Sequence, residues 1–218
     1  MKYFIANWKT NKTLQLSIEW MQTFLENYVP NENKKIIICP PFPFISKLNE
    51  MISQSAHVYI GSQDISVYEQ GTYTGEVSAL NLSGIIKYTI IGHSERSLHM
   101  HESTDISFQK SKLAHKYGFA QFYCIKNEND PYPPYVEFVC YEAIDAISTG
   151  DGKGNNKPLK IIIGLKRKLA LQPNTKFIYG GSVNENNCKE YFNSPEIDGF
   201  LIGGASLNPQ RFLAIINS

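Results

Sequence analysis

The chain of 218 residues is 42% hydrophobic and 19% charged, which is an ordinary globular composition. Its formal net charge of +1 gives no electrostatic reason to expect nucleic acid or an acidic membrane as a partner. The longest apolar runs are far too short to span a bilayer, and the first residues, MKYFIANWK, lack the long apolar stretch of a secretory signal, so we expect a cytoplasmic protein.

The first three predicted units each consist of a strand, a polar strand end and a helix. A strand at 3–6 leads to Asn7 and Lys9, and a helix follows at 16–28, where apolar residues recur at helical spacing. A second strand at 35–39 is stopped by two prolines, and a helix follows at 43–53. The third strand, 57–61, ends in SQD and is followed by a loop of turn formers, EQGTYTGE, and a short helix at 77–82.

The fourth unit, YTIIGHSER, is an apolar run that ends abruptly in a glycine and then presents His93. Such a run is typical of a strand buried on both faces, as in a parallel sheet covered by helices. Its helix is predicted at 105–117. The fifth strand, 120–125, is followed by KNENDPYPP, whose three prolines leave no room for a helix before the sixth strand, so one helix of the series is expected to be missing.

The sixth strand, 137–142, ends at Glu142 and opens into a polar, glycine-bearing loop before a helix at 158–171. The seventh and eighth strands, at 176–181 and 198–206, both contain glycine pairs and precede helices that end near 192 and 216. Eight strands, seven of them followed by helices, predict a (β/α)8 barrel in which residues 1–218 form a single domain. An open doubly wound sheet is the alternative.

In a barrel of this kind the residues that follow the strands converge at one face. That face would carry a carboxylate, an imidazole, an ammonium group, an amide and two glycine pairs, contributed by Asn7, Lys9, His93, Glu142, Gly180, Gly181, Gly203 and Gly204. Glycine pairs allow backbone N–H groups to approach an anion closely. A base, a neutral donor, a cation and a phosphate site are what proton transfer beside a carbonyl on a phosphorylated substrate requires.

The chain contains, in this order, the motifs ANWK, GSQD, GTYTGE, IIGHSER, CYE followed by a loop with STG, YGGSV and GFLIGGASL. Through these motifs it resembles the triosephosphate isomerase family over essentially its whole length. The resemblance implies a TIM barrel that interconverts dihydroxyacetone phosphate and D-glyceraldehyde 3-phosphate through an enediolate, in glycolysis and gluconeogenesis. It also implies a homodimer and no cofactor or metal.

The resemblance further implies roles for single residues. Glu142 would shuttle the proton, neutral His93 would hydrogen-bond the substrate oxygens, and Asn7 and Lys9 would stabilise the developing negative charge. Ser94 and Glu95 match supporting residues of the site, and the phosphate-binding positions are matched by Ser148, Ser182, Gly203 and Gly204. Residues 146–150 match a lid. Thr74, in a loop at 70–75, would reach the active site of the partner subunit.

The chain departs from the family pattern at several places. The hinge after the catalytic glutamate is Ala143, Ile144 and Asp145 in place of a rigid apolar hinge, and Asn127 stands where an acid is usual. A degenerate phosphate-binding barrel without turnover is therefore an alternative. Another phosphate-binding barrel, such as a Schiff-base aldolase, would need a lysine where Glu142 stands. Where the fifth helix is missing, we expect the side chains of Tyr132, Pro133, Pro134 and Tyr135 to cover the barrel.

The remaining candidate ligands of a metal are cysteines and histidines. The cysteines have no CxxC spacing, and three of the four lie in strand-like runs, so we expect free, buried thiols; they are Cys39, Cys124, Cys140 and Cys188. No other ligand-rich motif accompanies His99 and His101, which we interpret as surface residues.

Overall fold

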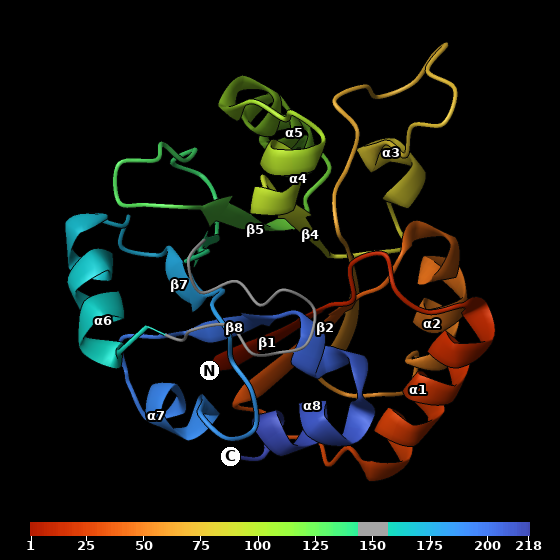
Figure 1. Ribbon diagram of the computed structural model, residues 1–218. Helices are drawn as coiled ribbons and strands as arrows, with labels where there is room; N and C mark the ends of the chain where they lie inside the picture. Colours follow the sequence, from red (N-terminus) through yellow and green to blue (C-terminus); the bar gives the residue numbers. More distant parts are fainter. Residues whose placement is uncertain (144–156) are drawn as a thin grey trace.

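The computed structural model describes residues 1–143 and 157–218, and its centre is a sheet of eight strands (Figure 1). The strands are β1 (Lys2–Asn7), β2 (Lys34–Cys39), β3 (Val58–Ser62), β4 (Tyr88–Ile91), β5 (Ala120–Ile125), β6 (Phe138–Tyr141), β7 (Lys176–Tyr179) and β8 (Gly199–Ile202). Each pairs in parallel with the next, and β8 pairs with β1, which closes the barrel. The predicted (β/α)8 barrel is confirmed, and the open doubly wound sheet is wrong.

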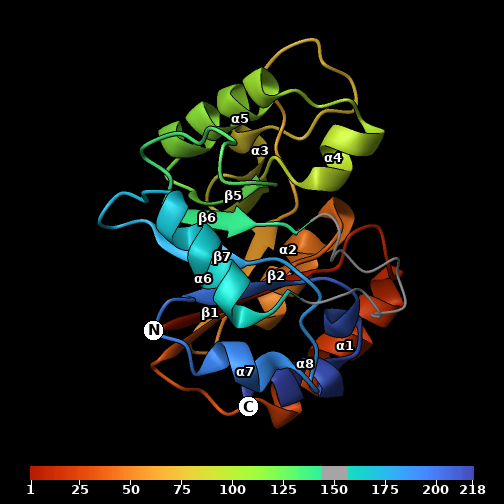
Figure 2. The same ribbon diagram turned by 60° about the vertical axis from the view of Figure 1, so that its left-hand side comes forward.

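Helices surround the barrel on its outer side (Figures 1 and 2). They are α1 (Leu14–Asn27), α2 (Ile45–Met51) with the preceding 3-10 turn η1 (Phe42–Phe44), α3 (Ala79–Leu82), α4 (Ser94–His99), α5 (Thr104–Lys116), α6 (Leu159–Lys168), α7 (Cys188–Phe192), the 3-10 turn η3 (Gly204–Leu207) and α8 (Pro209–Ile216). Helix α4 was not predicted, because its six residues, SERSLH, show no apolar period. In the part of the chain that the structure describes, no helix is long and apolar enough to cross a membrane.

Successive residues along a strand point alternately into the barrel and outward to the helices. Tyr3 and Ile5 belong to a buried cluster inside the barrel, whereas Phe4 and Ala6 pack outward with the helices. This alternation follows from the two-residue period of a strand. All four cysteines are free and buried, as predicted, and three of them, Cys39, Cys124 and Cys140, belong to the inner cluster.

No helix lies between β5 and β6, where residues 126–137 are all described, so the predicted loss of the fifth helix is confirmed. Figure 1 shows this green segment crossing from β5 past the space between α5 and α6. Asp130 organises its first turn, because its carboxylate accepts hydrogen bonds from the Lys126 N–H at 2.7 Å and the Asn127 side-chain amide at 2.8 Å. The Asn127 side chain therefore serves a local turn.

The second half of this segment covers the barrel only in part. Tyr132 packs against the outer core and Pro133 is buried, as predicted. Pro134 is exposed, so that prediction is wrong: the Val136 N–H closes a turn onto the Pro133 carbonyl at 3.3 Å and leaves Pro134 at the tip. Tyr135 lies against the His115 ring of α5, with centroids 4.6 Å apart, but it is 36% exposed.

Helix α5 packs on the barrel through a polar face. Its buried residues are Ser107, Lys110, Ser111 and Ala114. The Lys110 ammonium donates hydrogen bonds of 2.6 Å to both Asp64 and Glu102, and the Arg96 guanidinium lies 2.9 Å from Asp64 and 2.6 Å from Glu102. Two cations therefore neutralise two buried carboxylates, and this network joins the end of β3 to α4 and α5.

Replacing Lys110 with methionine leaves Asp64 and Glu102 buried with one cation between them. We expect Lys110→Met to lower the free energy of unfolding by about 3–5 kcal/mol, the cost of breaking a buried charge network on one side. Urea unfolding measures this. The control is Lys112→Met on the exposed side of α5, which should stay within about 0.5 kcal/mol of the wild type. Equal stability of the two variants would contradict the role of the network.

Candidate active site

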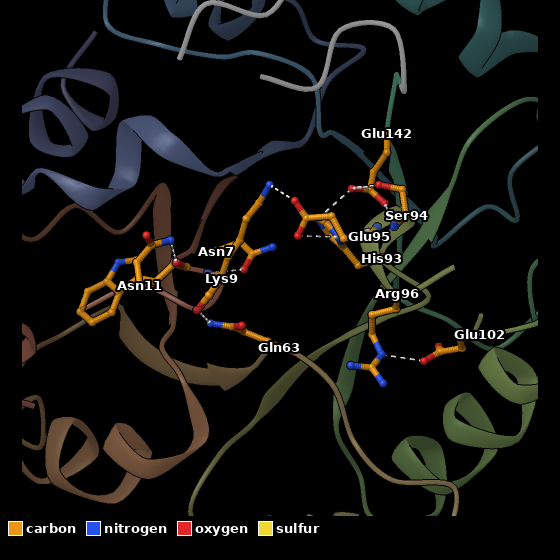
Figure 3. Close-up of polar contacts among 11 residues, drawn as sticks. Asn7, Lys9, Asn11, Gln63, His93, Ser94, Glu95, Arg96, Glu102 and Glu142 are labelled. Atoms are coloured by element: carbon orange, nitrogen blue, oxygen red, sulfur yellow. Dashed lines mark hydrogen bonds and ion pairs between the residues drawn. The ribbon is translucent and has the colours of Figure 1, made fainter. Parts of the chain in front are cut away.

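The polar residues that follow the strands line one pocket at the carboxyl end of the barrel. Its lining includes Asn7, Lys9, His93, Glu142, Ser182, Gly203 and Gly204. These residues come from β1, β4, β6, β7 and β8, so the barrel gathers side chains that are far apart in the sequence. All of them were predicted, Ser182 from the family resemblance and the others from their places after the strands. Figure 3 shows how four of them lie.

Glu142 follows β6 directly and is only 2% exposed. One carboxylate oxygen accepts a 2.7 Å hydrogen bond from the Ser94 N–H, the first of α4, and the other accepts a 3.2 Å bond from the Ser94 hydroxyl. The second oxygen also lies 2.9 Å from His93 Nε2. Burial raises the pKa of Glu142, but the His93 contact and the Ser94 hydrogen bonds outweigh burial, so the pKa is lowered overall.

The hydrogen bonds of His93 fix its tautomer. His93 is the N-cap of α4, and its Nδ1 accepts a hydrogen bond from the Glu95 N–H at 3.2 Å. A nitrogen that accepts carries no proton, so the proton of a neutral ring lies on Nε2, which faces Glu142. The structure thus presents His93 as a neutral donor pointing into the pocket.

Lys9 is held in an unusual backbone conformation. Its φ of 52° lies in the left-handed region, which is rare for a residue other than glycine. Asn7 Oδ1 accepts the Lys9 N–H at 3.0 Å, and the Gln63 amide donates to the Lys9 carbonyl at 2.8 Å. The Lys9 ammonium forms an ion pair of 2.5 Å with Glu95, as Figure 3 shows.

Gln63 is a site residue to which the sequence analysis assigned no role. Its amide donates hydrogen bonds to two carbonyls, those of Lys9 and Cys39, and so joins the ends of β1, β2 and β3. The signal that could have found it is its place directly after a strand, in the polar SQD run. Its action is through the backbone of Lys9.

Glycines and a hydroxyl form the other wall of the pocket. Gly203 lies so close to Lys9 that a Cβ there would be 3.5 Å from Lys9 Cε and 3.8 Å from Nζ. Gly204 begins η3, and Ser182, which is 8% exposed, has its carbonyl fixed by the Asn187 side-chain amide at 2.8 Å. The structure therefore places glycine backbone beside an ammonium group, an arrangement suited to an anion.

Not every predicted residue is brought to this pocket. Thr74 is exposed on a loop that projects above α3 in Figure 1. Ser148, the predicted lid at 146–150, and Ile144 and Asp145 of the hinge lie outside the described residues. Ala143, the first hinge residue, is buried.

The described residues offer no group of three or more His, Cys, Asp or Glu side chains that could hold a metal ion. His99 and His101 are exposed, as predicted.

Comparison with known proteins gives one consistent result. The family model described as triosephosphate isomerase matches residues 2–133 and 135–218. The chain is similar to proteins named triosephosphate isomerase from Dictyoglomus thermophilum (32% identity, 100% of this chain and 99% of the relative), Synechocystis sp. (33%, 99% and 98%) and Nostoc punctiforme (34%, 97% and 96%).

The lowered pKa of Glu142 makes a prediction about acid stability. A carboxylate whose pKa is lower in the folded than in the unfolded protein stabilises the fold above the unfolded pKa, near 4.5, and this contribution is lost as the pH falls through the folded pKa. We expect the free energy of unfolding of the wild type to fall more steeply below about pH 4.5 than that of Glu142→Gln. Urea unfolding between pH 3 and 7 measures both slopes, and parallel curves would contradict the lowered pKa.

Proposed function

The chain belongs to the triosephosphate isomerase family, and on that premise we propose that Glu142, His93, Lys9 and Asn7 carry out its reaction. The activity is the interconversion of dihydroxyacetone phosphate and D-glyceraldehyde 3-phosphate, a step of glycolysis. The observation that carries the residue assignment is the contact of a buried carboxylate with the N–H side of a neutral histidine, at the carboxyl end of the barrel.

Glu142 acts as the base that moves a proton between the two carbons. In the free site its carboxylate is stabilised by donors from Ser94 and His93. A substrate oxygen that accepts the hydrogen bond of His93 Nε2 takes one of these donors away from Glu142. When the Glu142 carboxylate moves from Ser94 toward the substrate, it also loses the two donors of Ser94. Burial then acts with less opposition, so the pKa of Glu142 rises and the carboxylate becomes a stronger base at the moment it is needed.

His93, Lys9 and Asn7 stabilise the charge that develops on the substrate oxygens. The neutral Nε2–H of His93 donates to them, as is established for this family. The Lys9 ammonium adds a positive charge, and Asn7 fixes the Lys9 backbone through its Oδ1. Glu95 pairs with Lys9 and, through its N–H, sets the His93 tautomer. Ser94 holds Glu142 between turnovers.

The phosphate group of the substrate binds at Ser182, Gly203 and Gly204. Support comes from the shared pocket and from the position of the Lys9 ammonium beside Gly203. The backbone of Ser148 as a further phosphate ligand and the lid at 146–150 stay predictions of the sequence. No cofactor takes part in this scheme. The sequence also predicts a single domain over residues 1–218 and a cytoplasmic location, which we retain as proposals.

Within residues 1–143 and 157–218, no observation favours the alternative of a degenerate barrel without turnover. The departures from the family pattern avoid the four reacting residues, and Asn127 is used in a turn of the β5–β6 segment. The working enzyme is the function that the site supports best.

Replacing Glu142 with glutamine keeps the shape of the side chain and removes the base. We expect kcat for D-glyceraldehyde 3-phosphate to fall by about 10²–10⁴-fold, the usual contribution of a positioned general base. A coupled assay measures this. Glu137→Gln, at the other end of β6, is the matched control and should stay within about twofold of the wild type. Retention of activity by Glu142→Gln would remove the base from the scheme.

We also propose that two copies of the chain form a homodimer through the loop that carries Thr74. Tyr68 and Tyr73 stack at this loop with centroids 3.7 Å apart and planes 6° apart, and both residues are 43% exposed. Met100, which is 65% exposed, lines a cleft of about 330 Å³, and Leu98, two residues earlier in the chain, is 69% exposed. The cleft also reaches Lys9 and Glu95, so a partner loop seated there would bring Thr74 to the active site.

A charge in this apolar surface should separate the subunits. We expect Met100→Asp to run as a monomer of 24.7 kDa in sedimentation analysis, where the wild type runs at about twice that mass, and to lose activity because the cleft beside Lys9 is left open. Val29→Asp places the same charge at a residue that is 75% exposed and outside this cleft, and it should leave the mass unchanged. A monomeric wild type would contradict the proposal.

A further inference from the structure

Lys12 occupies an unusual position three residues after Lys9. Its φ of 76° lies in the left-handed region, as does the 52° of Lys9, so one short loop contains two non-glycine residues in this conformation. Such a backbone conformation is strained for a residue other than glycine and persists where surrounding contacts determine it, which is most common at functional sites. The contacts of Lys9 have been described above. Those of Lys12 are independent of them.

The side chain of Lys12 is partly buried and held at its tip. Its ammonium donates a 2.7 Å hydrogen bond to the carbonyl of Leu207 and lies 5.2 Å from the centroid of the Trp8 ring. Trp8 is fully buried and lies between Asn7 and Lys9 in the chain. Lys12 therefore contacts the loop that supplies the reacting ammonium group and amide.

The other partner of Lys12 belongs to the glycine turn. Leu207 is the last residue of η3, which begins at Gly204, and Gly203 lies against Lys9 at the start of the same turn. The loop after β1 and the turn η3 are therefore in contact at both ends of η3. Lys9 lies beside Gly203 at the start of η3, and Lys12 binds Leu207 at its end. Lys12 thus holds the end of η3 to the β1 loop.

We infer that Lys12 is a positioning residue for the phosphate group of the substrate: it sets the separation between the Lys9 ammonium and the backbone of Gly203 and Gly204. This inference rests on the phosphate site proposed above. Lys12 acts on both walls of that site without lining it. Because an anion bound between the walls needs both at the right distance, loosening η3 weakens binding.

The turn has a second anchor, which determines the size of the effect. The Trp20 indole donates to the Ser206 carbonyl at 3.1 Å, and this bond stays when Lys12 is replaced. Loss of the Lys12 contact should thus loosen η3 and not unfold it. The change should appear in binding of the substrate and much less in the chemical step.

The test replaces Lys12 with methionine, which keeps an apolar stem and removes the ammonium. We expect KM for D-glyceraldehyde 3-phosphate to rise about threefold to tenfold, the range for one lost hydrogen-bonded contact, with kcat within about twofold. The dissociation constant of inorganic phosphate, measured by calorimetry, should rise by the same factor. Lys12→Arg, which can still donate to the Leu207 carbonyl, should restore most of both values.

Lys34 offers a matched control at the opposite end of the barrel. Its ammonium also donates to a helix-terminal carbonyl, that of Ile216, and lies 5.3 Å from the centroid of the Phe192 ring. We expect Lys34→Met to lower the melting temperature much as Lys12→Met does, with KM and phosphate binding unchanged. If both variants lose stability and neither changes KM or phosphate affinity, Lys12 is purely structural and the inference is overturned.

Phosphate binding separates this inference from the proposed function. If the wild type lacks isomerase activity but binds phosphate, and Lys12→Met weakens that binding while Lys34→Met does not, the proposed function fails and the role of Lys12 stands. If the wild type turns over substrate and phosphate affinity is the same in Lys12→Met as in the wild type, the role of Lys12 fails and the proposed function stands.

Discussion

The site depends on the hydrogen bonds that Ser94, the first residue of α4, donates to the Glu142 carboxylate. These bonds join Glu142, which follows β6, to Ser94, which lies 48 residues earlier after β4, and they offset the burial of a charge that is almost fully shielded from water. A buried carboxylate without such donors would take up a proton and could not act as a base. His93 also lines the pocket in which we propose that the substrate binds. In the proposed mechanism, the contact that stabilises the resting carboxylate is therefore one that substrate binding removes.

Buried ion pairs also stabilise the outer side of the barrel. Helix α5 has a polar buried face, and the segment after β5 contains no helix to support it from that side. The compensation is the network of Arg96 and Lys110 with two carboxylates, which is almost closed to water at Lys110. Burial of Asp64 raises its pKa to about 6 in spite of the two cations. The wall therefore includes a charge network beside the apolar side chains of Phe108 and Leu113, and Arg96 links that network to α4, whose first residue binds Glu142.

Much of this arrangement could be predicted from the sequence, and the rest could not for identifiable reasons. The strands and the convergence of Asn7, Lys9, His93 and Glu142 follow from apolar runs that end in polar residues, because parallel strands in a barrel have their ends on one face. Helix α4 was missed because it is short and lacks an apolar period. Gln63 contacts Lys9 and Cys39, Lys12 contacts Leu207, and Lys110 contacts Asp64, all at least 24 positions away in the chain, and no local pattern marks such contacts. Pro134 failed to cover the barrel because a turn, and not the apolar content, decides its direction.

The central claim is that Glu142 carries a proton between the two substrate carbons. Turnover of D-glyceraldehyde 3-phosphate in D2O, followed by NMR, tests it most directly. A proton held on a carboxylate can exchange with solvent before it is returned, so the account predicts deuterium at the carbon of dihydroxyacetone phosphate that receives the proton. Full turnover with no deuterium in the product, together with undiminished turnover by Glu142→Gln, would contradict the role of Glu142 as the base.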